Sequence, residues 1–186
     1  MATIRNGNKA ALVVVDVQVG VLRDAWEGPR VVQQVSTAVE RARAQGAPVI
    51  WIQHDDRELI HGSPDWQWVP GLVPVGAEPV IPKHYNSAFE HTDLEETLAG
   101  LGVTQVVVAG AATNWCIRAT VYAALERGYD VTLLKDAHTT QTSVLEDGTT
   151  LEAESIVRDL NLTLTWLSYP GRTSSSASAS AITFAT

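Results

Sequence analysis

The sequence predicts an α/β fold built on a parallel β-sheet. Two observations lead to this class. Short apolar runs rich in β-branched residues alternate with longer amphipathic segments, which is the pattern of repeated strand–helix–strand units. The short runs are apolar on both faces, as strands are when helices cover both sides of a parallel sheet. The chain has 186 residues, enough for one substantial core, so we expect a single domain, placed at residues 1–170.

Six short runs are the strand candidates. Each is rich in valine, isoleucine, leucine or threonine and is bounded by polar or turn residues. In chain order they are AALVVVD (10–16), APVIWIQ (47–53), EPVIPK (78–83), TQVVVAG (104–110), DVTLLKDA (130–137) and LTLTWLS (162–168).

Four longer segments between these runs are the helix candidates. The first three end at a glycine, the residue that most often stops a helix at its C-terminus. The four segments cover residues 28–45, 92–101, 115–128 and 148–160.

Two segments fit neither pattern. Residues 54–78 have no helical period and carry Trp66 and Trp68, and a loop of this length in a compact domain is usually functional. Residues 171–186 form a tail rich in serine and alanine. We predict that most of this tail is mobile, with its AITF segment (181–184) docking on a neighbouring subunit.

Composition excludes several classes of partner. The net charge is −8, and no cluster of lysine and arginine offers the positive surface that nucleic acid or an anionic membrane requires. The single cysteine cannot form an internal disulfide and indicates a reducing compartment. Asp16 ends the first apolar run too early for a secretory signal or a membrane span. We therefore expect a cytoplasmic protein with neither nucleic-acid nor membrane partners.

Polar residues follow the predicted strands at the edge where such folds bind ligands. In an open α/β sheet the ligand site lies beyond the carboxyl ends of the strands. The residues at those ends are Asp16, His54, Asp55, Lys83, Cys116, Asp136 and His138.

Three of these residues together have the chemistry of an activated nucleophile. Cys116 falls in the first turn of a predicted helix, where free N–H groups and the helix dipole favour an anion and lower the pKa of a thiol. A carboxylate at Asp16 is a proton acceptor, and an ammonium group at Lys83 would hold both anions in place.

Each residue alone also has a simpler interpretation. A lone cysteine is often a buried small hydrophobe, an aspartate after a strand is often a cap or turn residue, and Lys83 is compatible with a solvated position. The occurrence of all three at strand ends favours catalysis.

Two segments resemble the isochorismatase-like cysteine hydrolase superfamily, which includes nicotinamidases, N-carbamoylsarcosine amidase and streptothricin hydrolases. They are ALVVVDVQVGVL (11–22) and KHYNSAFEHTDLEETLAGLGVTQVVVAGAATNWCIRATVYAALERGYDVTLLKDAHTT (83–140). The resemblance implies a three-layer, doubly wound α/β fold, with a six-stranded parallel sheet in the order 3-2-1-4-5-6 and helices on both faces. It also implies a homodimer or homotetramer.

The resemblance further implies a catalytic triad of Asp16, Lys83 and Cys116. It implies a cis peptide bond between Ala111 and Ala112, and an oxyanion hole formed by the N–H groups of Ala112 and Cys116. In the reaction it implies, Asp16 takes the thiol proton, Cys116 forms a thioester, and water hydrolyses the thioester.

Several further residues are candidates for contacting the substrate. The aromatic ones are equally compatible with core or interface positions, and the amides with hydrogen bonds to backbone alone. These candidates are Gln18, Trp68, Tyr85, Phe89, Asn114 and Trp115. Arg118 is predicted to be a structural ion-pair partner.

No metal or other cofactor is expected. Nicotinamidases of the superfamily bind a divalent metal through an Asp-x-His motif after the second strand, and WIQHDDRELIHGSPDW (51–66) does not reproduce it. A metal held by His54, Asp55 and His61, which lie in or beside this loop, is the alternative that the sequence leaves open.

The predicted function is cysteine-dependent hydrolysis of a C–N bond in a small-molecule amide or lactam. The stretches GSPDWQWVPGL (62–72) and LSYPGRT (167–173) are similar to those of streptothricin hydrolases. Two alternatives remain: a vinyl ether hydrolase of the isochorismatase type, and a non-catalytic binding protein that keeps the fold. True isochorismatases generally lack the nucleophilic cysteine, so Cys116 favours amide chemistry.

Overall fold

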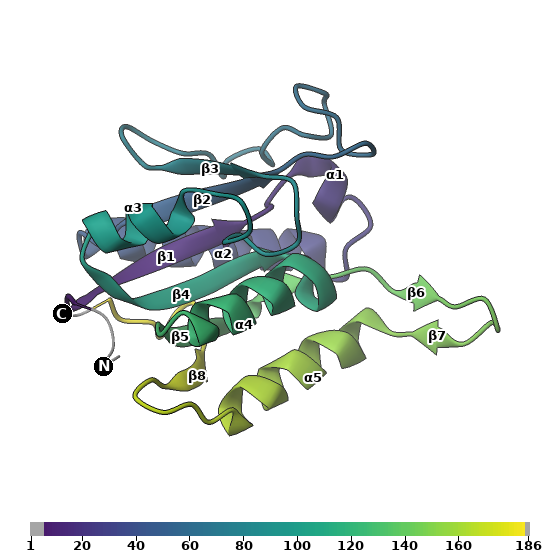
Figure 1. Cartoon of the computed structure of the whole chain (residues 1–186). Helices are drawn as coiled ribbons and strands as arrows, with labels where there is room; N and C mark the ends of the chain where they lie inside the picture. The colour runs from purple at the N-terminus through teal and green to yellow at the C-terminus, as the bar shows by residue number, and fades with distance from the viewer. Residues whose placement is uncertain (1–5, 185–186) are drawn as a thin grey trace.

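A computed structural model describes residues 6–184 and contains one six-stranded sheet in which every strand pair is parallel. The strand order is β3-β2-β1-β4-β5-β8 (Figure 1). The strands are β1 (Lys9–Val15), β2 (Val49–His54), β3 (Val80–Lys83), β4 (Val103–Ala111), β5 (Asp130–Thr139) and β8 (Ser174–Ala177). With β8 as the sixth strand, this is the predicted order, and the doubly wound α/β class is confirmed.

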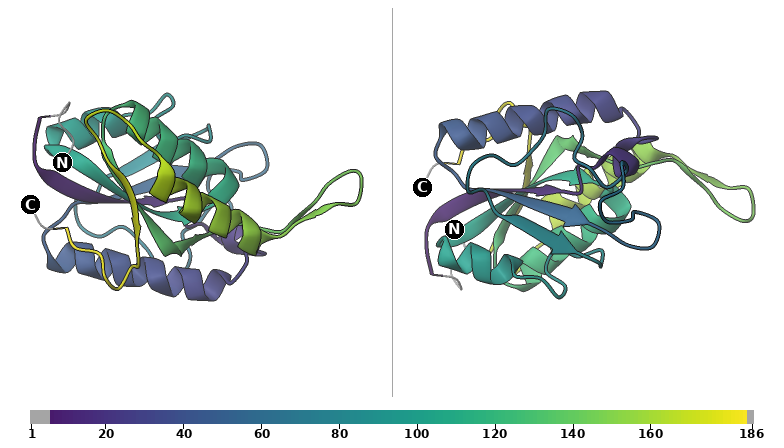
Figure 2. Two further views of the ribbon diagram at one scale, coloured as in Figure 1. Left: turned by 90° about the horizontal axis from the view of Figure 1, so that it is seen from below. Right: turned by 90° about the horizontal axis from the view of Figure 1, so that it is seen from above.

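Helices cover both faces of the sheet, which gives three layers (Figure 2). One face packs against α2, whose buried residues Val31, Val35 and Val39 recur at helical spacing. The other face packs against three helices and a turn. The bounds are α1 (Val19–Leu22), α2 (Gly28–Ala44), α3 (Leu94–Gly100), the π-helical turn η1 (Thr113–Ile117), α4 (Arg118–Glu126) and α5 (Ala153–Trp166).

The central strands are buried on both faces, as their apolar sequences predict. Val13 and Val15 of β1 point into the core beneath α3, α4 and α5, whereas Leu12 and Val14 point into the core beneath α2. All four side chains are fully buried. The sheet therefore holds the carboxyl ends of β1 and β4 in a fixed position.

The last predicted strand is wrong. Residues 162–168 belong largely to α5, and the sixth strand is β8, which pairs with β5 from Val131↔Ser174 to Leu134↔Ala177. The reason is visible in α5, where Leu160 and Leu164 are buried one helical turn apart.

The prediction of a mobile tail is also wrong. Residues 174–177 complete the sheet, and the following segment packs against the α2 face of its own chain. Ile182 and Phe184 are buried there, and Arg41 of α2 donates two hydrogen bonds to the Ile182 carbonyl oxygen at 2.9 and 3.1 Å. The AITF segment thus docks on its own chain and not on a neighbouring subunit.

One hairpin was not predicted. Strands β6 (Ser143–Val144) and β7 (Thr150–Leu151) form a separate two-stranded sheet that projects from the body of the molecule (Figures 1 and 2). Because β7 uses residues 150–151, α5 begins at Ala153 and not at residue 148 as predicted.

Within residues 6–184, no helix combines the length and the apolar character needed to cross a membrane.

Residues 54–78 contain turns without a helix or an internal strand pair, as predicted.

Gly110 is required where β4 passes β1. Its φ angle is 122°, and a Cβ atom at this position would lie 1.9 Å from the carbonyl oxygen of Val15. Backbone of both strands would have to move to relieve this clash.

We expect Gly110→Ala to lower the free energy of unfolding by about 3 kcal/mol or more, because it adds a steric clash to a strained backbone conformation. Urea denaturation followed by circular dichroism measures this. Gly100→Ala in α3 is the matched control, since a Cβ there meets nothing within 4 Å. Equal stability of the two variants would show that the β1–β4 contact is not tight.

Candidate active site

The three predicted catalytic side chains meet at the carboxyl end of the sheet. Asp16 follows β1, Lys83 ends β3, and Cys116 lies in η1 after β4. The Lys83 Nζ atom is 2.7 Å from Asp16 Oδ2 and 3.2 Å from Cys116 Sγ. All three residues are buried. The lysine therefore bridges the carboxylate and the sulfur in a place that water reaches poorly.

Asp16 has one carboxylate oxygen committed and one free. Oδ2 forms the ion pair with Lys83, whereas Oδ1 is buried without a hydrogen-bond partner among the described residues. The backbone at Asp16 has a φ of 50°, an uncommon conformation for a residue other than glycine. Strained backbone of this kind is concentrated at functional sites, and the free oxygen is suited to accept a proton.

The turn that carries Cys116 differs from the predicted start of a regular helix. Residues 113–117 form a π-helical turn in which the N–H groups of Trp115 and Ile117 both donate to the Ala112 carbonyl oxygen at 3.1 Å. The Ala111–Ala112 peptide bond before it is cis. The Ala112 N–H has no backbone acceptor among the described residues. This donor, four residues before Cys116, is therefore left for another group.

The resting thiol is neutral, which corrects the prediction of a lowered pKa. Burial, followed by the negative charge of Asp16, raises the pKa of Cys116 to about 12, and the positive charge of Lys83 opposes this only in part. The position after β4 does not lower this pKa, because burial and a second anion beside Asp16 both disfavour a thiolate. If this sulfur acts as a nucleophile, its proton leaves during attack and not before it.

Lys83 has two further partners. Its Nζ lies 3.2 Å from His54 Nδ1 and donates to the Tyr85 carbonyl oxygen at 3.1 Å. Tyr85 thus reaches the cluster through its backbone, while its side chain is about half exposed.

Gln18, a predicted substrate ligand, holds the long loop instead. Its Nε2 donates to the carbonyl oxygens of His54 at 2.9 Å and Trp66 at 2.8 Å, and its Oε1 accepts from the His54 N–H at 2.9 Å. The side chain is fully buried. Hydrogen bonds to the backbone alone were the alternative that the sequence left open to a role of Gln18 in substrate binding.

Two predicted aromatic ligands lie elsewhere. Trp68 packs edge-to-face on Trp51, with ring centroids 5.4 Å apart, on the α2 side of the sheet, whereas Cys116 belongs to the core on the opposite side. The Phe89 ring lies 5.9 Å from the Tyr129 ring and 5.1 Å from the Arg127 guanidinium, two residues that follow α4. Both rings thus have packing partners, and their contact with a substrate stays a prediction.

Asn114 and Trp115 directly precede Cys116 in the sequence and lie in the same π-helical turn. Asn114 Oδ1 accepts a hydrogen bond from Thr140 Oγ1 at 2.6 Å, and the Trp115 side chain is more than half exposed. Arg118 pairs with Asp159 at 2.8 Å, which confirms its predicted structural role.

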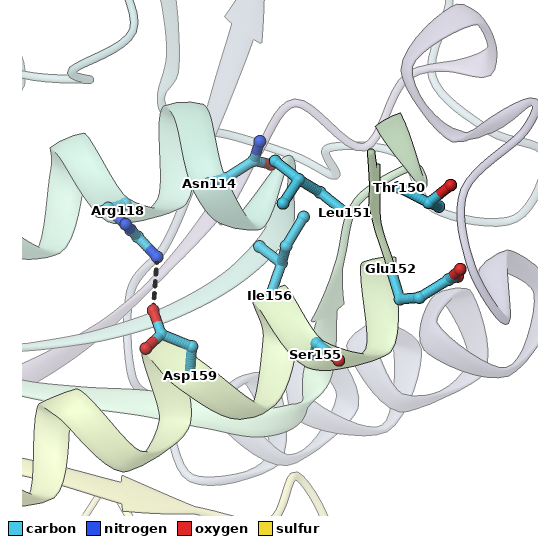
Figure 3. Close-up of a pocket in the computed structure, with 8 residues that line it drawn as sticks. All are labelled: Asn114, Arg118, Thr150, Leu151, Glu152, Ser155, Ile156 and Asp159. Carbon is cyan, nitrogen blue, oxygen red and sulfur yellow. Dashed lines mark hydrogen bonds and ion pairs between the residues drawn. The ribbon is translucent and has the colours of Figure 1, made fainter. Parts of the chain in front are cut away.

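A surface depression of about 390 Å³ opens beside η1 (Figure 3). Its lining comes from η1, α4, the β6–β7 hairpin and α5. The contribution of the hairpin was not predicted because its residues 150–151 were assigned to the following helix. The lining residues are Asn114, Arg118, Thr150, Leu151, Glu152, Ser155, Ile156 and Asp159.

The histidines after β2 form pairs and do not form a metal cluster. Asp55 binds His61 Nδ1 at 3.1 Å through Oδ2 and His84 Nδ1 at 2.6 Å through Oδ1. His54 is engaged separately by Lys83 and Asp56. Within the described part of the chain, no three His, Cys, Asp or Glu side chains are arranged to hold a metal ion.

His138, at the end of β5, anchors the turn that carries the cysteine. Its Nδ1 lies 2.8 Å from Thr113 Oγ1 and its Nε2 lies 3.0 Å from Asn161 Oδ1. Asn161 donates its own amide hydrogen to the Lys135 carbonyl oxygen, so its Oδ1 is the acceptor and Nε2 carries the hydrogen. Burial lowers the pKa of His138 to about 4.

Comparison with known proteins places this chain in a family. Residues 10–157 match the isochorismatase domain. The chain is 36% identical over 138 residues to a streptothricin hydrolase of Streptomyces noursei, which covers 70% of this chain and 54% of that protein. It is 32% identical over 142 residues to a ureidoacrylate amidohydrolase of Methylobacterium radiotolerans, covering 59% and 55%. The chain thus spans about half the length of these curated relatives.

A solved structure agrees over nearly the whole chain. An isochorismatase from Pseudomonas putida KT2440 superposes with a TM-score of 0.84 at 26% identity, covering 95% of this chain and 93% of that one. Fold and site together define a doubly wound α/β protein with a buried Asp–Lys–Cys cluster. The chain belongs to the isochorismatase family.

The raised pKa of Cys116 predicts slow alkylation. We expect iodoacetamide to modify the protein at pH 7 to 8 much more slowly than a free thiol, with the rate still rising above pH 9. Asp16→Asn removes the neighbouring negative charge and is expected to accelerate the reaction at pH 8 about ten-fold or more. Intact-protein mass spectrometry measures both rates. Rapid modification of the unaltered protein below pH 7 would contradict a neutral resting thiol.

His138 predicts a loss of stability in acid. The group is neutral when buried, with a pKa of about 4, and regains its ordinary value near 6.5 on unfolding. Its contribution is therefore fully present above pH 6.5 and falls by about 3 kcal/mol as pH drops from 6.5 to 4.

Urea denaturation of the unaltered protein and of His138→Gln at several pH values between 7 and 4 measures this contribution. The variant, which lacks the titrating group, is expected to lose less stability over that range. Parallel curves for the two proteins would mean that His138 does not titrate as described.

Proposed function

We propose that this protein hydrolyses a C–N bond of a small-molecule amide or lactam through a thioester on Cys116. The observation that carries the proposal is the buried ion pair of Asp16 and Lys83 beside the only thiol of the chain. The streptothricin hydrolase and ureidoacrylate amidohydrolase among its relatives support amide-like chemistry.

The first step joins proton transfer to attack. Because the thiol rests neutral, Cys116 gives its proton to the free Oδ1 of Asp16 as Sγ forms a bond to the carbonyl carbon. The negative charge then moves from the carboxylate to the substrate oxygen. Lys83 stays beside the carboxyl group and the sulfur, and its positive charge limits the rise in energy during the transfer.

The substrate oxygen needs donors of its own. The N–H groups of Ala112 and Cys116 are proposed to serve as the oxyanion hole, and the free Ala112 N–H supports this assignment. Removal of one such donor typically costs about 3 kcal/mol of transition-state stabilisation.

Two steps complete the reaction. The carboxyl proton on Asp16 passes to the leaving nitrogen as the C–N bond breaks, which leaves a thioester. Water then gives a proton to the Asp16 carboxylate while its oxygen attacks the thioester carbonyl. Collapse breaks the C–S bond, releases the acid, and returns the proton from Asp16 to the sulfur, which restores the thiol and the carboxylate. The protons and electrons of these steps balance with this chain, the substrate and water alone.

The depression beside η1 is the proposed place for the rest of the substrate. Asn114 and Arg118 line it from either side of Cys116 in the sequence, and Leu151 and Ile156 supply apolar surface (Figure 3). We propose a substrate of the streptothricin-hydrolase type. The homodimer or homotetramer and the cytoplasmic location remain predictions.

Capture of the thioester tests the proposal. We expect a panel of small amides and lactams to include at least one that releases amine or ammonia, with an acyl group on Cys116 detected by intact-mass spectrometry after acid quench. Cys116→Ala should abolish turnover, and Asp16→Asn should lower kcat by about a thousand-fold or more, because it removes the proton acceptor.

The alternatives give different results. Retention of full turnover by Cys116→Ser, with no acyl adduct, would favour a non-amide hydrolase such as a vinyl ether hydrolase. No turnover of any substrate by the unaltered protein would favour a binding role. Arg158→Gln on the exposed face of α5 is the control for these variants. Gln18→Glu is unsuitable because Gln18 supports the loop.

A further inference from the structure

Lys83 is surrounded by more hydrogen-bond acceptors than it has hydrogens. Asp16 Oδ2, Cys116 Sγ and the Tyr85 carbonyl oxygen lie at 2.7, 3.2 and 3.1 Å from Nζ. The fourth neighbour is His54 Nδ1 at 3.2 Å. An ammonium group has no lone pair, so this nitrogen must be the acceptor in any hydrogen bond with Lys83.

The other ring nitrogen of His54 is held by Asp56. His54 Nε2 lies 3.1 Å from Asp56 Oδ2. A carboxylate only accepts, so Nε2 carries the hydrogen and Nδ1 keeps its lone pair towards Lys83. Asp56 therefore selects the tautomer that Lys83 requires.

Asp56 is itself fixed in orientation and charge. Its Oδ1 accepts hydrogen bonds from the N–H groups of Leu59 at 2.7 Å and Glu58 at 2.8 Å. The bond from Leu59, and then that from Glu58, hold the pKa of Asp56 below its usual range. The carboxylate therefore remains ionised and cannot rotate without losing both bonds.

The backbone of His54 is fixed as well. Gln18 both donates to its carbonyl oxygen and accepts from its N–H, each at 2.9 Å. The register of the two strands adds a third constraint on the His54 backbone, because His54 on β2 pairs directly with Lys83 on β3. The ring is thus held from its backbone and from its outer nitrogen.

We infer that His54 is a positioning residue that holds the Lys83 ammonium between Asp16 and Cys116, and that Asp56 acts through it by setting the tautomer. The catalytic consequence rests on the function proposed above. The hydrogen-bonding role rests only on the contacts of Lys83, His54 and Asp56. Removing the lone pair takes a stabilising partner from a buried cation, which weakens the support that Lys83 gives to a thiolate.

Other charged groups near His54 are accounted for. The ring lines a second depression, of about 350 Å³, together with Arg23, Glu58 and Asp65. Arg23 and Asp65 form an ion pair with each other. Lys83, with Asp16 behind it, faces Nδ1, and Asp56 faces Nε2.

Asp56→Asn is the sharpest variant. The two backbone N–H groups at the Oδ1 position require an oxygen there, so the amide NH₂ of the new side chain must face His54 Nε2. That donor forces Nε2 to accept, and the hydrogen moves to Nδ1, where it opposes Lys83. The substitution thus inverts the tautomer while it keeps shape and the hydrogen bonds from Glu58 and Leu59.

Two substitutions of His54 separate its two nitrogens. In His54→Asn the amide oxygen takes the place of the Nδ1 acceptor, whereas His54→Gln places its amide near Nε2 and leaves the Nδ1 position empty. Glu58→Gln is the control for charge, because it removes one negative charge from the same depression without touching His54.

The measurements are the rate of Cys116 alkylation at pH 9 and, with a substrate, kcat and KM. We expect Asp56→Asn and His54→Gln to lower the alkylation rate about ten-fold and to lower kcat about ten-fold or more, with KM changed less than about three-fold. His54→Asn should retain about ten-fold more activity than His54→Gln. Asp56→Asn added to His54→Asn should have little further effect.

The outcomes separate this inference from the proposed function. Equal values for the two His54 variants, or an Asp56→Asn protein that matches Glu58→Gln in both measurements, would overturn the positioning role. Failure of the unaltered protein to hydrolyse any amide would count against the proposed function alone, because the alkylation rates still test the contact of His54 with Lys83. Circular dichroism of each variant establishes that the fold is intact.

Discussion

The buried ammonium group of Lys83 is the interaction on which the rest of the site depends. A buried cation is unfavourable unless it is paired and hydrogen-bonded, so the surrounding strands must supply acceptors. The sheet order determines which strands can do so. Lys83 starts on β3, whereas Asp16 follows β1, two strands or about 10 Å away. The long side chain must cross the end of β2, which is where His54 lies.

The same charge balance explains why the thiol rests neutral. The site contains one buried cation and one buried carboxylate, and a thiolate would add an anion without a second cation. Transfer of the Cys116 proton to Asp16 moves the negative charge within the site and does not increase it. Ionisation of the thiol is therefore favourable only when it is coupled to attack on a substrate whose oxygen has its own donors.

Much of the fold could be predicted because each central strand carries its own signal. The first five strands are continuous apolar runs, and the polar residues at their ends converge because the strands are parallel. The sixth strand carries no such signal. Ser174–Ala177 has few residues that favour strands, and only pairing with β5 makes it one. LTLTWLS (162–168) has the composition of a strand, yet burial of Leu160 and Leu164 makes the segment helical.

Site residues that depend on side-chain direction could not be predicted in the same way. Trp68 follows the strand that ends at His54, but it packs on the α2 side of the sheet and Cys116 on the other, and sequence alone does not give the side on which a loop residue packs. His54 illustrates a different limit. Its position at a strand end was evident, but its proposed role depends on the hydrogen bond of Asp56, whose own orientation depends on the N–H groups of Glu58 and Leu59. In this inference, a turn two residues beyond β2 determines which nitrogen of the His54 ring carries the hydrogen. The long loop then contributes to the site through the tautomer of His54.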